Sequence, residues 1–253
     1  MIKNNEIRKH FLLYAFLLFA ITSCATKPSY QVDPENPSIP VAPAVVKDKE
    51  IMEMIEPYKL QLDETMNEVI GYSEKELRKD KIESPLGNFT SDAILKRSRM
   101  VSENDIDLAA ITIGGLRTTL PEGEILLKDI YELMPFENAV YILELTGTQT
   151  KMLFDYLAKN KNIAIANSMV ILRGEEVEQV FIGGKAFNEN ESYTLAISDY
   201  LAGGGDHMTF LKNAKVLEKL PLKVRDLLIE EVKAQHASGK KIYANVEGRI
   251  RLL

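Results

Sequence analysis

A glycine pair and an arginine stand where a short apolar segment ends. Residues 107–113 are mostly apolar and lead into Gly114 and Gly115, a pattern typical of a strand that leaves a sheet through a tight turn. Arg117 lies just beyond this turn. Its planar guanidinium group matches phosphate or carboxylate, and loops at strand ends often bind ligands. A plain turn in which Arg117 pairs with a surface acid explains the same pattern.

Two further residues, Phe136 and Asp206, are candidates for ligand contacts because of the segments that precede them. Phe136 comes after a short helical stretch, and on local pattern alone it is equally explained as a core residue. Asp206 comes after the glycine run 203–205 and is followed by His207. The aspartate either contacts a ligand or caps the N-terminus of a helix. We expect His207 to be a turn residue rather than a general base.

Several segments, taken in order, resemble the C-terminal domain of the 5'-nucleotidase and UDP-sugar hydrolase family. The family hallmarks are an Asn-Gly-Gly-Gly-Ile-Arg motif, a Leu-Pro-Phe-Gly-Asn stretch and a later Gly-Gly-Asp run. The resemblance covers about residues 50–253 and implies an α/β fold, with mixed sheets and helices packed against them. The segments that carry it are SPLGNFTSDAIL, GGLRTTLPEGEILLKDIYELMPFENAV, LELTGTQ, SDYLAGGGDHMTF and VEGRI.

Residue by residue, the resemblance implies a nucleoside or nucleotide site, in a family that takes part in nucleotide catabolism. Phe136 and Tyr200 match the two positions whose rings sandwich the nucleobase, and stacking contributes about 1–3 kcal/mol per base. Arg117 matches the arginine that contacts the charged groups of the substrate. Asp206 matches the aspartate that accepts hydrogen bonds from ribose hydroxyls. The glycine-motif residues Thr112, Gly114 and Gly115 complete the expected site.

The chain departs from the family pattern at four places. Tyr200 replaces the usual phenylalanine, which keeps the ring and adds a hydroxyl. Thr112 stands where the family has asparagine, and Ile113 where it has the first glycine of the motif. Another family arginine falls near Asp80 or Lys81, and Lys81 is a candidate to replace its charge. These departures bear most on how phosphate is bound.

The family hydrolyses phosphate esters with a two-metal site in a separate N-terminal metallophosphatase domain. The three histidines of this chain, His10, His207 and His236, form no recognisable set of metal ligands. We expect no catalytic residue and no bound cofactor here, and divalent metals in a separate metallophosphatase subunit. Two alternatives stay open: a stand-alone nucleoside or nucleotide-sugar binding lipoprotein with no enzymatic role, and a complete phosphatase with unrecognised motifs.

The N-terminus has the pattern of a lipoprotein signal. Lys3, Arg8 and Lys9 precede an apolar run over residues 11–21, which is too short for an ordinary transmembrane helix. Cys24, the single cysteine, closes a lipobox-like sequence, so we expect its acylation in an exported bacterial protein. An ordinary cleavable signal with a chance cysteine is the alternative.

This pattern predicts that the chain has three parts. We expect a lipoprotein signal peptide over 1–24, a tether over 25–47 that holds five of the ten prolines, and one domain over 48–253. The lipid would anchor the protein in the cell envelope, facing the periplasm or the surface. Removing the basic signal changes the net charge from −6 to −8, which disfavours polymeric nucleic acid as a partner.

Periodicity predicts the elements of the domain. Ser84 and Pro85 predict the start of an amphipathic helix in which Asn88 and Asp92 are polar-face residues, and Thr146 with Gln149 predicts a second helix start. We expect Met152, Leu153, Tyr156 and Leu157 of that second helix to be core. The other expected elements are a helix from 48 interrupted near Pro57, strands over 67–72, 139–145, 193–200 and 246–252, two strands within 168–182, and a helix from Val224 that ends near Gly239.

Overall fold

The computed structural model describes residues 48–253. The expected signal peptide and tether over 1–47, and Cys24 with them, lie outside the described residues. By its contacts the chain divides into residues 1–52 and 53–253, and the second unit is the domain described below. No helix within residues 48–253 combines the length and the apolar character needed to cross a membrane.

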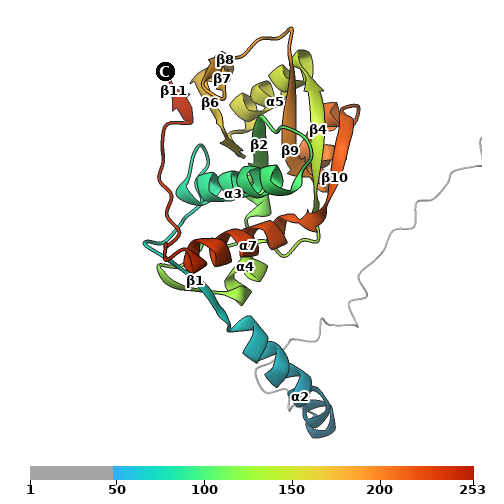
Figure 1. Cartoon of the computed structure of the whole chain (residues 1–253), viewed down its shortest axis with the longest axis vertical. Coiled ribbons are helices and arrows are strands. Elements are labelled where there is room, and N and C mark those ends of the chain that lie inside the picture. Colours follow the sequence, from blue (N-terminus) through green and yellow to red (C-terminus); the bar gives the residue numbers. More distant parts are fainter. Residues whose placement is uncertain (1–47) are drawn as a thin grey trace, which may run out of the picture. The chain divides into compact units, whose positions relative to one another are not determined.

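A five-stranded mixed sheet forms the centre of the domain. Its strand order is β10–β4–β9–β2–β5, and Figure 1 shows β9 between β2 and β4. The β2–β9 pair is parallel, whereas the other neighbours pair antiparallel. The strands are β2 (Leu108–Thr112), β4 (Ala139–Thr146), β5 (Ile163–Ala166), β9 (Ser192–Ser198) and β10 (Lys215–Lys223).

Both faces of this sheet are buried. Successive side chains of a strand point to opposite faces, so neighbouring residues belong to different hydrophobic cores. In β2, Ala109 and Ile111 belong to one hydrophobic core, and Leu108 and Ala110 belong to the other. The first core is completed by helices α3 (Pro85–Val101), α4 (Leu127–Leu133) and α7 (Val224–Ala237). The second is completed by α5 (Gly147–Asn160) and a second sheet. The expected α/β fold with mixed sheets and packed helices is therefore confirmed.

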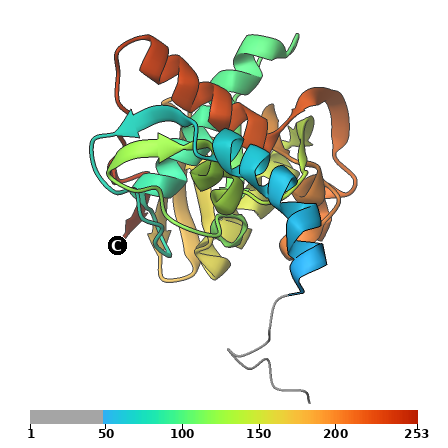
Figure 2. The ribbon, with the colours of Figure 1, turned by 90° about the horizontal axis from the view of Figure 1, so that it is seen from below.

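Two smaller sheets complete the domain. One has the order β11–β6–β7–β8, and the other is the antiparallel pair β1–β3. Figure 2 shows β1 and β3 side by side next to α7. Their bounds are β1 (Val69–Ser73), β3 (Gly123–Leu126), β6 (Ser168–Arg173), β7 (Glu176–Ile182), β8 (Lys185–Ala186) and β11 (Ile250–Leu252).

The predicted helix starts are confirmed in atomic detail. The Ser84 hydroxyl accepts a hydrogen bond of 3.0 Å from the Gly87 amide, and Pro85 is the first residue of α3. Thr146 and Gln149 form a capping box at the start of α5. Helix α7 ends at Ala237, before Gly239, which has a φ of +71°. Local signals of this kind are visible in sequence because capping involves near neighbours.

Four expectations about the elements were wrong. Helix α2 (Lys49–Met66) continues through Pro57, where the sequence predicted a break, and buries no residue. Met152 is 45% exposed and is not core. Tyr200 lies on the short helix α6 (Asp199–Ala202), beyond the end of β9. The last strand, β11, has only three residues, because the segment before it is held by side chains instead of a ladder.

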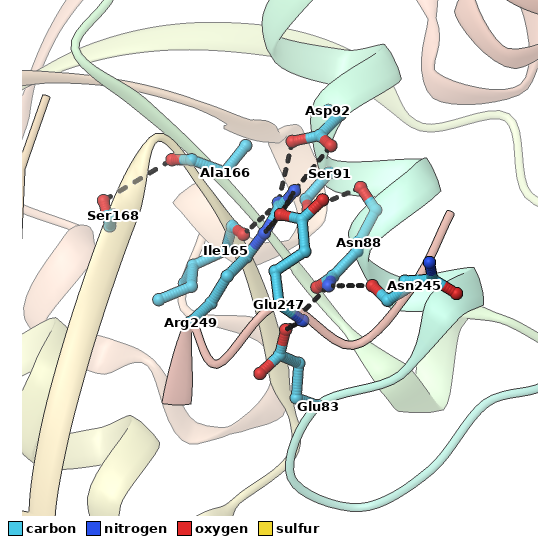
Figure 3. Close-up of polar contacts among 10 residues, drawn as sticks. All are labelled: Glu83, Asn88, Ser91, Asp92, Ile165, Ala166, Ser168, Asn245, Glu247 and Arg249. Carbon is cyan, nitrogen blue, oxygen red and sulfur yellow. Dashed lines mark hydrogen bonds and ion pairs between the residues drawn. The ribbon is translucent and has the colours of Figure 1, made fainter. Parts of the chain in front are cut away.

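Figure 3 shows the side chains that hold this segment against α3. The guanidinium of Arg249, whose side chain is 12% exposed, donates to both carboxylate oxygens of Asp92 at 2.7 Å and to the Ile165 carbonyl at 2.9 Å. The Asn88 amide donates to the Asn245 carbonyl at 2.8 Å. Asn88 is buried and so is not the polar-face residue that was expected, whereas Asp92 is exposed. Both residues hold the C-terminal segment, and neither lines the cavity described below.

A second polar cluster joins α3 to α7. The Glu231 carboxylate is only 3% exposed and accepts hydrogen bonds from Lys96 and Arg97 of α3, both at 2.7 Å, and from Gln235 at 2.8 Å. Burial alone would raise the pKa of this carboxyl, but the three hydrogen bonds outweigh burial and hold the pKa below its usual value. The ionised form of Glu231 therefore stabilises the contact between the two helices.

Replacing Glu231 by Gln should lower the free energy of unfolding by about 1–3 kcal/mol near neutral pH, because charge-assisted hydrogen bonds are lost. The folded-state pKa lies below the unfolded value of about 4.3, so this contribution is complete above that pH. It is lost as the pH falls through the folded-state pKa. Urea unfolding of both proteins at neutral and acidic pH measures the difference, which should shrink in acid. An unchanged difference would contradict this role.

Candidate functional site

A cavity of about 460 Å³ lies at one edge of the central sheet. The parallel strands β2 and β9 end at this edge, at Thr112 and Ser198, and β4 begins there at Ala139 because it runs antiparallel to β9. The loops that follow β2 and β9 and the segment that precedes β4 are thereby brought together. All seven predicted site residues line the cavity: Thr112, Gly114, Gly115, Arg117, Phe136, Tyr200 and Asp206. That they bind a ligand stays a prediction.

Two aromatic rings are left open at the cavity. Phe136 is 38% exposed and Tyr200 is 52% exposed, so Phe136 is not the core residue that its local pattern allowed. The Tyr200 ring lies against the backbone of Gly205, where an added Cβ atom would come within 2.5 Å of two ring atoms. Glycine at position 205 is therefore required for this ring position. Both rings offer apolar faces on which a planar ligand can stack.

Asp206 is held by two tyrosine hydroxyls and does not cap a helix. Its Oδ1 accepts a hydrogen bond of 3.0 Å from the Tyr200 hydroxyl, and its amide donates to the same hydroxyl oxygen at 3.2 Å. Its carbonyl accepts a hydrogen bond of 2.7 Å from the Tyr156 hydroxyl. Asp206 and His207 both have positive φ, +49° and +66°, so His207 is a turn residue as expected.

One cation, Arg117, lines the cavity, and a second, Lys79, contacts the loop that carries it. Arg117 is exposed, its Nη1 donates to the Gly114 carbonyl at 3.4 Å, and no carboxylate within residues 48–253 forms an ion pair with it. Lys79 reaches this loop, since its Nζ donates to the Leu116 carbonyl at 2.8 Å, whereas the candidate Lys81 has no side-chain hydrogen bond to it within residues 48–253. A Cβ atom on Gly114 would meet open space. The loop around Gly114 and Arg117 is thus accessible to a ligand.

Sequence reasoning missed two residues of the segment before β4. Asn138 lines the cavity beside Phe136 and adds an amide to it. Its carbonyl accepts a hydrogen bond of 2.9 Å from the Val224 amide. Glu137 accepts hydrogen bonds from Lys223 and Arg225 at the start of α7. The signal for Asn138 was its place two residues after Phe136, whereas Glu137 depends on partners far along the chain.

The contact of Glu137 with α7 fixes the segment that carries Phe136. Arg225 is buried, and its guanidinium lies 4.2 Å from the centre of the Tyr131 ring as well as against Glu137. The hydrogen bonds from Lys223 and then Arg225 hold the pKa of the Glu137 carboxyl below its usual value. Glu137 is therefore ionised at neutral pH, and both partners bind a carboxylate.

Replacing Glu137 by Gln should loosen the segment 135–138 while the global unfolding midpoint changes little, because Gln keeps an acceptor for Arg225. Hydrogen exchange of the amides in this segment should become faster than in the unmodified protein. In the unmodified protein the same loosening should occur in acid, as the pH falls through the lowered pKa of Glu137. Equal exchange in both proteins at neutral pH would show that Glu137 does not position Phe136.

Metal ligands bear on the activity of this chain, because the resemblance concerns a family that hydrolyses phosphate esters with metals. Within residues 48–253, no group of three or more His, Cys, Asp or Glu residues is arranged to hold a metal ion. His236 lies at the end of α7, with its ring 5.4 Å from that of Tyr72. His207 borders a shallower hollow that adjoins the cavity beside Tyr200.

The fold and the cavity define an α/β domain with a ligand-sized site built from strand-end loops. The model of the "5'-nucleotidase, C-terminal domain" family matches residues 67–213, which is more than half of the chain. The protein belongs to this family. The matched region includes all seven predicted site residues and Asn138.

Similar proteins agree with this assignment. The chain is 27% identical over 243 residues to the trifunctional nucleotide phosphoesterase protein YfkN of Bacillus subtilis, covering 87% of this chain and 16% of that protein. It is 27% identical over 218 residues to a 5'-nucleotidase of Vibrio vulnificus, covering 81% of this chain and 36% of that protein. The chain thus spans well under half the length of these relatives.

Among solved structures, the fold matches that of a 5'-nucleotidase precursor from Thermus thermophilus. The TM-score is 0.68 at 22% identity, and the match covers 82% of this chain and 44% of that chain. A putative 5'-nucleotidase from Staphylococcus aureus matches with a TM-score of 0.66 at 14% identity, covering 82% and 44%. At these identities the likeness concerns the fold.

Proposed function

We propose that this chain is the nucleoside- or nucleotide-binding half of a 5'-nucleotidase, and that it acts with a metallophosphatase carried by a separate subunit. The base stacks between Phe136 and Tyr200, Asp206 accepts from the sugar, and Arg117 faces the phosphate. The observation that carries this proposal is the convergence of these four side chains, from three separate segments, on one cavity. Its volume of about 460 Å³ lies within the range of small-molecule sites.

The chemistry of the cavity supports a nucleotide over other small ligands. Two exposed rings provide stacking faces that tolerate any base. An arginine that forms no ion pair within residues 48–253 provides charge and a planar fork for phosphate. A carboxylate and the Asn138 amide provide hydrogen-bonding groups between them. A purely apolar ligand would leave these polar groups without partners.

Replacing Phe136 by Ala should weaken nucleoside binding by about 1–3 kcal/mol, because one stacking face is lost. The melting temperature should change little, since Phe136 is partly exposed. Titration calorimetry with adenosine measures the first effect, and thermal unfolding the second. Tyr243→Ala is the matched control, because this exposed tyrosine does not line the cavity. Unchanged affinity in Phe136→Ala would reject stacking on this ring.

Replacing Arg117 by Ala should weaken binding of a nucleoside monophosphate by about 1 kcal/mol, the amount expected of an exposed charge pair. Binding of the matching nucleoside should be unaffected, because the nucleoside carries no phosphate. Calorimetric titrations at two salt concentrations measure both, and the nucleotide term should shrink at the higher salt. An equal loss of affinity for the nucleoside and the nucleotide would show that Arg117 does not recognise the phosphate.

The proposed partner follows from what the resemblance implies about catalysis. A phosphate ester held at the mouth of the cavity needs metals to be hydrolysed, and in the family a metallophosphatase domain supplies them. Acylation at Cys24 would anchor the protein in the cell envelope. Confining both subunits to one membrane surface would raise their effective concentration.

Mixing this protein with an exported metallophosphatase that lacks such a domain should raise the rate of nucleotide hydrolysis. Arg117→Ala should reduce the gain, because the phosphate is then positioned less well. Phosphate release and co-purification are the two measurements. If the metallophosphatase works equally well alone and no complex forms, the subunit proposal fails. Nucleoside binding without any enzymatic role then becomes the better account.

A further inference from the structure

The Tyr200 hydroxyl forms two hydrogen bonds with Asp206, one as donor and one as acceptor. It donates to Asp206 Oδ1 at 3.0 Å and accepts from the Asp206 amide at 3.2 Å, which closes a small hydrogen-bonded ring. Within residues 48–253, no hydrogen bond is formed by the other carboxylate oxygen, Oδ2. The carboxylate that lines the cavity therefore has one oxygen in use and one available.

The backbone conformation around Asp206 fixes this arrangement. Asp206 has a φ of +49°, in the left-handed region that is strained for a residue with a side chain. The hydrogen bond from Tyr156 to its carbonyl, at 2.7 Å, and the two bonds to Tyr200 offset this strain. The Tyr200 ring is itself held over Gly205. The fold of the loop thus holds the Tyr200 hydroxyl and the Asp206 carboxylate in contact.

We infer that the Tyr200 hydroxyl determines which sugars the cavity accepts, an inference that rests on the proposed function. A carboxylate has about two acceptor sites on each oxygen, and two adjacent hydroxyls of a ribose are bound side by side when each oxygen faces one of them. Here the Tyr200 hydroxyl takes the place of one of those two donors at Oδ1. Only one sugar hydroxyl then gains a charge-assisted hydrogen bond, and either the 2' or the 3' hydroxyl can be that one. The cavity binds ribonucleosides and deoxyribonucleosides with similar affinity.

The test compares adenosine with 2'-deoxyadenosine and 3'-deoxyadenosine, by titration calorimetry on the intact protein and on Tyr200→Phe. This substitution keeps the ring for stacking and frees Oδ1. The unmodified protein should bind the three within about threefold, less than one charge-assisted hydrogen bond would produce. In Tyr200→Phe the preference for adenosine over the weaker deoxynucleoside should rise by roughly tenfold, the value of one such bond.

Two control variants separate this role from a general loosening of the loop. Tyr156→Phe removes the hydrogen bond to the Asp206 carbonyl but not the one to the carboxylate, so it loosens the loop without freeing Oδ1, and the preference should rise far less than in Tyr200→Phe. Tyr243→Phe removes a hydroxyl outside the cavity and should change nothing. Melting temperatures of all variants establish that each is folded.

The outcomes distinguish this inference from the proposed function. If the unmodified protein binds nucleosides and Tyr200→Phe leaves the ribose preference unchanged, the inference is wrong and nucleoside binding stands. A strong preference for adenosine in the unmodified protein would overturn it in the same way. If the unmodified protein binds none of the three nucleosides, the proposed function fails, and the inference fails with it.

Discussion

The parallel pairing of β2 with β9 is the constraint on which the site depends. Both strands are buried on two faces between separate hydrophobic cores, so their register is strongly specified. Because parallel strands end at the same edge, the loops after Thr112 and Ser198 must meet there. The antiparallel partner β4 brings a third segment, with Phe136 and Asn138, to that edge. Four chemically different side chains converge because three strands share one sheet.

Polar contacts then orient the side chains that the sheet brings together. Glu137 ties the Phe136 segment to the start of α7, and the Asn138 carbonyl adds a backbone hydrogen bond to Val224. In the loop after β9, Tyr156 and Tyr200 hold Asp206 in a conformation that it would otherwise avoid. Polar contacts of neighbouring residues thus hold both Phe136 and Tyr200 in place, while each ring remains partly exposed. Sites held in this way lose little conformational freedom on binding.

The sequence predicts features that arise between near neighbours or from strong periodicity. The caps at Ser84 and Thr146 and the helix from Val224 were visible because they need only a few consecutive residues. Strand β10 was missed, since it is an edge strand with several lysines and Pro221. Local pattern singled out Gly114, Gly115 and Arg117 as a ligand-binding turn, whereas the pairing of Phe136 with Tyr200 came from the family resemblance. The bonds made by Glu137 and Arg249 join residues far apart in the chain, so no local pattern announces them.

The most direct test of the central claim, that this cavity holds a nucleobase between Phe136 and Tyr200, is nuclear magnetic resonance with labelled aromatic residues. Magnetisation transfer between the base protons of bound adenosine and the two rings reports their contact. The account predicts transfer to both rings and an upfield shift of the base protons, as expected for a stacked base. A nucleoside that binds without transfer to either ring would contradict the account.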